Sequence, residues 1–126
     1  MVKINTRNTK QKQIVASNIK KRFDHPTANE IYEDLIKHNS KIGLTTIYRI
    51  LNDLVEEGKI NKIITPDQHS HFDYNRINHI HFICNKCFHI YDIDENEFSE
   101  LEFKFMKNNY NIKNISIQGI CENCKN

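Results

Sequence analysis

Side chains that can bind metal are concentrated in the second half of the sequence. All four cysteines lie there, in two Cys-x-x-Cys pairs made by Cys84 with Cys87 and by Cys121 with Cys124. Four thiolates in two such pairs can complete the tetrahedral shell of a zinc ion, with each sulfur ~2.3 Å from the metal. Because the pairs use every cysteine and leave none over, the spacing predicts one structural zinc site.

The alternatives for these cysteines are two disulfides or four free thiols. The residues that follow Met1 are Val2, Lys3, Ile4 and Asn5, and they form no apolar secretory signal. We therefore expect a cytoplasmic protein, whose thiols stay reduced. Paired cysteines in a reducing compartment favour a bound metal over disulfides.

Two histidines just before the first cysteine pair need a separate role. His79 and His81 alternate, so in a strand their side chains lie on the same face. Four cysteines already fill a zinc shell, which leaves these imidazoles spare. Two imidazoles with carboxylates suit a divalent ion such as iron, manganese or zinc. The alternative is a pair of solvated histidines at a sheet edge.

Charge is distributed unevenly along the chain. The 126 residues have room for one ordinary domain or two small ones, and the net charge is +2. Residues 1–63 carry twelve Lys and Arg against seven Asp and Glu, whereas residues 64–126 carry six against nine. A basic first half predicts an anionic partner for that half. No apolar run approaches the ~20 residues of a membrane span, so no membrane association is expected.

Three helices are predicted in the first half. Thr9 is expected to cap a helix over about residues 10–22, which ends before His25 and Pro26. Thr27 and Glu30 have the spacing of a capping box that starts the second helix. The apolar stripes of these two helices include Ile14 and Ile36, respectively. Gly58 is expected to end the third helix as its C′ residue.

The third helix has one apolar and one polar side. Ile47, Ile50, Leu51, Leu54 and Val55 cluster on one side of a helical wheel. The other side offers hydroxyl, amide and guanidinium groups, which suit base edges and phosphates. The candidate DNA-binding residues are Thr45, Thr46, Tyr48, Arg49 and Asn52. A three-helix bundle with a solvated polar face is the alternative.

Strands are predicted on both sides of a polar connector at residues 75–78. Residues 59–64 and 69–74 have the pattern of a hairpin, which would form the wing of a winged helix. Beyond the connector we expect strands over 79–84, 87–93 and 112–119 and a helix over 94–109.

The sequence resembles the ferric uptake regulator family from about Thr9 to Cys124. The matching stretches are His25-Pro26-Thr27-Ala28, Glu30-Ile31-Tyr32, Thr45-Thr46-Ile47-Tyr48-Arg49-Ile50-Leu51, Glu57-Gly58, His79-Ile80-His81-Phe82-Ile83-Cys84 and Gly119-Ile120-Cys121. The combination of a TxYR-type helix with HxHxxCxxC is specific to this family. Most members carry a further helix before the position of Thr9, where this sequence has eight residues.

The resemblance implies an α+β fold with two domains. An N-terminal winged helix-turn-helix DNA-binding domain is expected over 1–74, and a small C-terminal α/β dimerisation domain over 79–126. It also implies a homodimeric, metal-dependent transcriptional repressor rather than an enzyme. Its partner would be a double-stranded DNA operator, palindromic and AT-rich, with half-sites about one helical turn apart.

The resemblance also assigns two metal sites. Cys84, Cys87, Cys121 and Cys124 match the family's structural Zn²⁺ site, and His25, Asp73, His79, His81 and Asp92 match a regulatory site for Fe²⁺ or Mn²⁺. This second ligand set is similar to that of the peroxide-sensing branch, whereas Arg49 is more like the iron-uptake branch. A further site found in some members needs a carboxylate and a histidine where this chain has Ile80 and Lys113, so that site is expected to be absent.

Three alternatives to a peroxide sensor remain open. The first is an iron-level or zinc-level sensor repressor of the same family. The second is a small metalloenzyme that uses the His/Asp cluster, although no HExxH-type motif or spare nucleophile accompanies it. The third is a zinc-ribbon adaptor that binds only protein, which the basic first half and the polar face of the third helix argue against.

Overall fold

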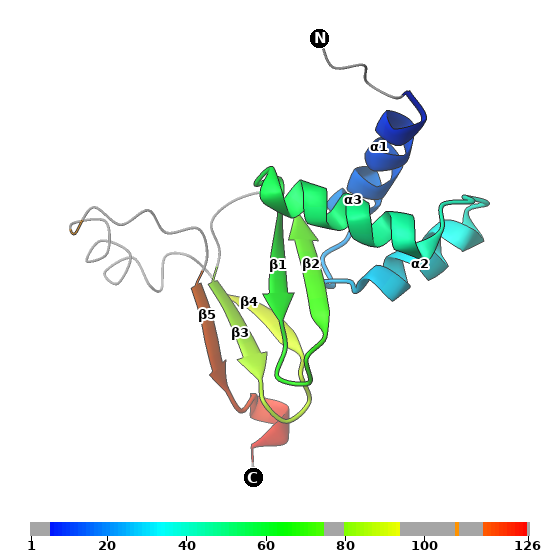
Figure 1. Ribbon diagram of the computed structural model, residues 1–126. Helices are drawn as coiled ribbons and strands as arrows, with labels where there is room; N and C mark the ends of the chain where they lie inside the picture. The colour runs from blue at the N-terminus through cyan, green and yellow to red at the C-terminus, as the bar shows by residue number, and fades with distance from the viewer. Residues whose placement is uncertain (1–5, 75–79, 94–107, 109–114, 126) are drawn as a thin grey trace. The chain divides into compact units, whose positions relative to one another are not determined.

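The computed structural model describes residues 6–74, 80–93, 108 and 115–125 (Figure 1). The chain divides into two compact units, one of Met1–Ile64 with Gln68–Asn75 and one of Thr65–Asp67 with Arg76–Asn126. The helices and strands are α1 (Thr6–Lys20), α2 (Ala28–Lys37), α3 (Leu44–Glu56), β1 (Ile60–Ile64), β2 (Ser70–Tyr74), β3 (Ile80–Cys84), β4 (Ile90–Ile93), β5 (Ile115–Gly119) and the 3-10 helix η2 (Glu122–Cys124). Among the described residues, no helix is both long and apolar enough to cross a membrane.

The first helix begins earlier than the sequence predicted. Helix α1 starts at Thr6, so Thr9 lies inside it and is not its cap. Residues 6–8 contain neither proline nor glycine, so they can continue the helix on the N-terminal side of Thr9. Val15 and Ile19 are buried. Ile14, which was expected in the apolar stripe, is 42% exposed.

The second helix begins as the sequence predicted. The Glu30 backbone N–H donates to Thr27 Oγ1 at 3.2 Å, and the Thr27 N–H donates to Glu30 Oε1 at 3.4 Å. The capping box is therefore present and satisfies two donors at the start of α2. Ile31 and Leu35 are buried, but Ile36 is 49% exposed, so the prediction that it belongs to the buried stripe is wrong.

The third helix has the predicted apolar face and the predicted end. Ile47, Ile50, Leu51 and Leu54 are buried in the core of the first unit. Gly58 has φ +74°, which suits a glycine at C′. Its N–H donates to the Val55 carbonyl and the next N–H donates to the Leu54 carbonyl, both at 3.0 Å. These two bonds make a Schellman motif that stops α3 before the hairpin.

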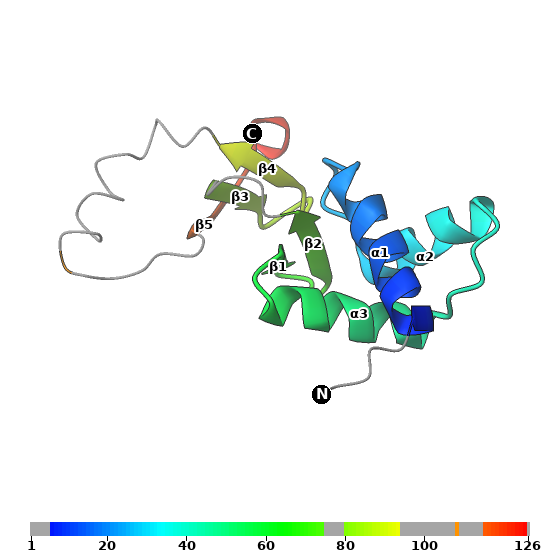
Figure 2. The same ribbon diagram turned by 90° about the horizontal axis from the view of Figure 1, so that it is seen from above.

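The hairpin completes the core of the first unit. Strands β1 and β2 are antiparallel, and their register runs from Ile60 opposite Tyr74 to Ile64 opposite Ser70. Phe72 of β2 is buried among the helices. On its other edge, β2 is bridged to the loop before α2 at Thr27 and His71. Figure 2 shows α1, α2 and α3 with the hairpin in the same unit.

The described part of the second unit is a three-stranded sheet. Its strand order is β4-β3-β5, with β3 antiparallel to β4 and parallel to β5. Strand β4 starts at Ile90, three residues later than predicted, because the turn that carries Cys84 and Cys87 extends to His89. Phe88 in this turn has φ 63°.

Strand β5 corresponds to the end of the predicted strand 112–119. A Cβ atom on Gly119 would lie 3.1 Å from the Phe82 ring, so a larger residue where β5 passes β3 would require that ring to shift by a few tenths of an ångström. The predicted helix over 94–109 lies outside the described residues, apart from residue 108. The α+β fold class is confirmed, and the boundaries 1–74 and 79–126 stay a prediction.

Candidate metal sites and nucleic-acid interface

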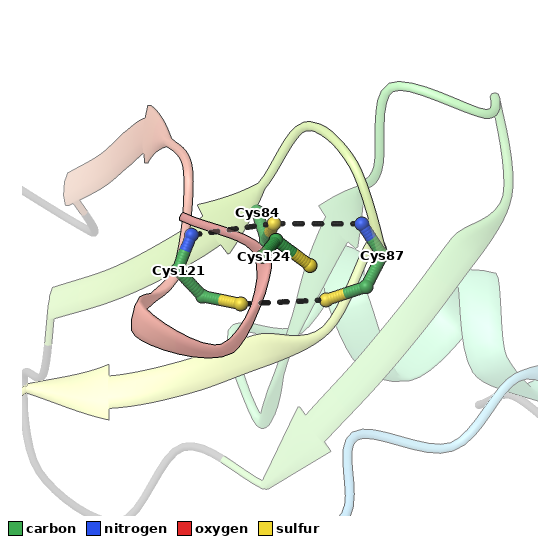
Figure 3. Close-up of side chains that lie close together, drawn as sticks. All are labelled: Cys84, Cys87, Cys121 and Cys124. Atoms are coloured by element: carbon green, nitrogen blue, oxygen red, sulfur yellow. Dashed lines mark hydrogen bonds between the residues drawn. The ribbon is translucent and has the colours of Figure 1, made fainter. Parts of the chain in front are cut away.

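The four cysteines meet at one end of the β-sheet in the second unit. Cys84 ends β3 and Cys87 lies in the following turn, while Cys121 and Cys124 flank and end η2 after β5. Their sulfur atoms all lie within 4.8 Å of one another (Figure 3). The pairing of β3 with β5, which sets Cys84 opposite Gly119, brings the two pairs together.

The spacing of the sulfurs fits a tetrahedral metal site. Cys87 Sγ lies 3.7 Å from Cys121 Sγ. A tetrahedron with metal–sulfur bonds of ~2.3 Å has edges of about 3.8 Å. A disulfide needs a sulfur–sulfur distance of about 2.05 Å. None of the four cysteines forms a disulfide, so the disulfide alternative is wrong for this structure, and the four sulfurs are grouped as the predicted metal site requires.

Hydrogen bonds from backbone amides stabilise the thiolate form of Cys84. The N–H groups of Cys87, Cys121 and Lys86 donate to Cys84 Sγ at 3.4, 3.4 and 3.3 Å. These hydrogen bonds lower the pKa of the Cys84 thiol to about 5. A thiolate is the form that binds metal, so these hydrogen bonds favour the ligating form of Cys84.

Hydrogen bonds shift the pKa values of Cys121 and Cys124 in opposite directions. A hydrogen bond from the Tyr91 hydroxyl lowers the pKa of Cys121. The hydrogen bond between the side chains of Cys124 and Cys121 raises the pKa of Cys124 to about 12. A metal that binds all four sulfurs therefore displaces the Cys124 proton. Sequence reasoning missed Tyr91, because no spacing rule links a strand tyrosine to a distant cysteine.

The second unit also pairs a histidine with a carboxylate. His81 of β3 and Asp92 of β4 are direct partners in the antiparallel register. His81 Nε2 lies 3.4 Å from Asp92 Oδ1, with His81 buried and the Asp92 side chain 45% exposed. Both side chains were predicted metal ligands. His79, the third predicted ligand from this part of the chain, lies outside the described residues.

The first unit supplies a similar pair. His25 lies in the loop between α1 and α2, and Asp73 lies in β2. Their potential ligand atoms are within 4.8 Å of each other. The N–H of Phe72, next to Asp73, donates to the Pro26 carbonyl at 2.8 Å, which fixes the loop against the strand. The predicted ligands thus form one histidine–carboxylate pair in each unit.

A histidine that the sequence analysis did not select also contacts this loop. His71 Nδ1 lies 2.8 Å from the His25 carbonyl oxygen. Since a carbonyl can only accept, His71 Nδ1 carries the proton and donates. The available sequence signal is weak: His71 lies two residues before Asp73 and so shares its face of the strand.

The polar face of α3 is open to solvent. Thr45, Arg49 and Asn52 are exposed, Tyr48 is 43% exposed, and Thr46 is half-buried. The face follows directly from the burial of the opposite side of the helix in the core. Exposed hydroxyl, amide and guanidinium groups on one helix can donate to phosphates and base edges.

Comparison with known proteins gives consistent matches along the chain. The model of the Ferric uptake regulator family matches residues 3–120. The peroxide-responsive repressor PerR of Staphylococcus epidermidis is 32% identical over 126 residues, which cover 98% of this chain and 84% of that protein. PerR of Staphylococcus aureus strain USA300 is 30% identical over 120 residues, covering 93% and 81%.

Two solved structures show the same fold. The ferric uptake regulator Fur of Helicobacter pylori superposes with a TM-score of 0.81 at 22% identity, covering 94% of this chain and 84% of that one. The peroxide stress regulator of Campylobacter jejuni has a TM-score of 0.76 at 29% identity, covering 95% and 90%.

Proposed function

Because the chain belongs to the ferric uptake regulator family, it is a metal-dependent transcriptional repressor rather than an enzyme, and we propose that it senses peroxide. The observation that carries this proposal is the presence of a histidine–carboxylate pair in each unit, His25 with Asp73 and His81 with Asp92. The similarity to peroxide-responsive repressors along almost the whole chain supports it.

The four-cysteine site is proposed to hold one structural zinc ion per chain. Support comes from the sulfur spacing and from the amide hydrogen bonds to Cys84, which stabilise a thiolate before metal arrives. Zinc suits this site because it prefers four tetrahedral sulfur ligands and takes no part in redox chemistry. Its role would be to hold the second unit in a form that dimerises.

The regulatory site is proposed to contain His25, Asp73, His79, His81 and Asp92. Three imidazoles and two carboxylates suit Fe²⁺ or Mn²⁺. Two of these ligands belong to the first unit and three belong to the rest of the chain. A metal that needs all five prefers the arrangement in which both units supply their ligands, and so it shifts the population toward that state. This state is the one proposed to bind operator DNA.

Peroxide would act on the ligands of this site. Fe²⁺ held by these residues would supply the electrons that cleave the O–O bond of H₂O₂, so that one oxygen would leave as water and the other could be transferred to an imidazole carbon. His25 and His79 are the proposed targets, each gaining one oxygen atom. An oxidised imidazole no longer binds the metal, so the DNA-binding state is lost without any step at a cysteine. Mn²⁺ would fill the site without this reaction.

Mass spectrometry of the metal-loaded protein tests the peroxide proposal. After brief exposure of the Fe²⁺ form to low H₂O₂, we expect a gain of one oxygen on the peptide that carries His25 or His79, together with loss of operator binding. The Mn²⁺ form is the control and should gain none. If the Fe²⁺ form keeps its histidines unmodified and its DNA bound, the protein is an iron-level sensor, the alternative to which Arg49 points.

The exposed face of α3 is proposed to enter the major groove of the operator. Its contacts would come from Thr45, Thr46, Tyr48, Arg49 and Asn52. A dimer presents two such helices, so the operator is proposed to be palindromic and AT-rich, with half-sites about one helical turn apart.

Arg49→Ala should weaken operator binding by ~1–3 kcal/mol if the guanidinium reads a base. The measurement is titration of a labelled operator with the Mn²⁺-loaded protein at fixed salt. Lys37→Ala removes another exposed cation, at the end of α2, and serves as the matched control. If Arg49→Ala binds the operator as tightly as the wild type does, Arg49 is not part of the interface.

A further inference from the structure

The loop that carries His25 has an unusual backbone. His25 has φ 52°, in the left-handed region that residues with a Cβ atom seldom adopt. The next residue is Pro26, which by itself favours an extended conformation for the residue before it. Such a conformation persists only when surrounding contacts determine it, and it commonly marks a functional position.

Contacts on both sides hold this turn. Before it, Arg22 donates to both carboxylate oxygens of Asp24, with Nε–Oδ1 at 2.9 Å and Nη2–Oδ2 at 2.7 Å. After it, the Pro26 carbonyl accepts the Phe72 N–H at 2.8 Å. The carbonyl of His25 itself accepts from His71 Nδ1–H at 2.8 Å. The His71 hydrogen bond acts directly on the left-handed residue.

We propose that His71 is a positioning residue for the metal ligand His25. Its hydrogen bond to the His25 carbonyl fixes the plane of the peptide that follows His25, and with it the direction in which the imidazole leaves the backbone. The ligand is then oriented before metal binds, so less conformational freedom is lost on binding. This inference rests on the proposed function only in taking His25 as a ligand.

The geometry of this hydrogen bond suggests variants that test the positioning role of His71 separately from its volume. Because Nδ1 is the donor, an asparagine at position 71 can place its amide nitrogen close to the same point. Leucine has a similar volume and no donor. His38 provides a matched control, since its Nδ1 makes the same kind of bond, at 2.8 Å, to the Asp34 carbonyl in α2.

The experiment measures Mn²⁺ affinity in full-length, zinc-loaded dimer. His71→Leu is expected to weaken Mn²⁺ binding by roughly 10–100-fold, the range found when an outer partner of a metal ligand is removed. His71→Asn should restore most of the affinity, and His38→Leu should leave it unchanged. In a His25→Ala background, His71→Leu should have little further effect, because its role passes through His25. Thermal melts of each apo variant check that the protein is folded.

Three outcomes would overturn the inference. If His71→Leu binds Mn²⁺ like the wild type while His25→Ala does not, His71 has no positioning role. If His71→Asn is as weak as His71→Leu, His71 acts as a direct ligand rather than through its donor. If His25→Ala itself binds Mn²⁺ normally, the assignment of His25 as a ligand fails, and this result is distinct from the first two.

Discussion

Cys84→Ser is expected to abolish zinc binding and dimer formation together. The Cys84 sulfur accepts hydrogen bonds from three backbone N–H groups, which stabilise its thiolate form. A serine hydroxyl is a poor zinc ligand and leaves these donors facing a neutral oxygen. Zinc binding at such a site contributes on the order of 10 kcal/mol to folding, which exceeds what a unit of this size can replace by packing. Zinc per chain and the molar mass in solution are the measurements.

The control for this variant is Asn85→Ser, which changes an exposed residue in the same turn. It should keep one zinc ion per chain and the mass of a dimer. A Cys84→Ser protein that retains both would show that the four-cysteine site is dispensable for assembly.

Asp92→Ala should remove the metal dependence of operator binding while leaving zinc and the dimer intact. Asp92 lies opposite His81 and 3.4 Å from its Nε2, so its loss leaves the histidine without its carboxylate at the proposed regulatory site. Coupling between two binding sites is typically about 5–150-fold. We expect the operator affinity in Mn²⁺ to fall by such a factor, to that of the metal-free protein.

Asp73→Ala should behave in the same way, because it removes the carboxylate of the other pair. Glu33→Ala, which deletes an exposed carboxylate on α2, is the control and should bind operator with full metal dependence. Operator titrations with and without Mn²⁺ separate the variants. Wild-type metal dependence in both aspartate variants would contradict regulation through this ligand set.

The parts of the fold that were predictable are those governed by local rules. Helix α3 has a strong apolar periodicity, and Gly58 ends it through a motif that needs only a left-handed residue. The capping box at Thr27 and Glu30 is likewise contained in four residues. The four-cysteine site was predictable because its chemistry is confined to one residue type with fixed spacing.

The wrong predictions of helix and strand boundaries arise where a local sequence pattern is compatible with more than one structure. Thr9 could cap a helix or lie within one, and the core positions Val15 and Ile19 are compatible with both. The predicted strand over 87–93 started too early because backbone hydrogen bonds from Phe88 to Cys84 and from Cys84 to His89 close a turn there. The contact of His71 with the His25 loop could not be predicted from spacing, since its partner is a backbone carbonyl 46 residues away.

The parallel pairing of β3 with β5 joins residues far apart in the chain and so favours one order of folding in the second unit. In the β3–β4 hairpin, Ile83 is opposite Ile90, seven residues along the chain, whereas Ile80 is opposite Ile115, 35 residues along. A fivefold longer loop costs about 1.4 kcal/mol more to close. Loop closure therefore favours formation of the hairpin with Cys84 and Cys87 before β5 pairs with β3. A metal bound first by Cys84 and Cys87 would favour this later pairing, because Cys121 and Cys124 follow β5, so we expect the refolding rate of this unit to rise with zinc concentration.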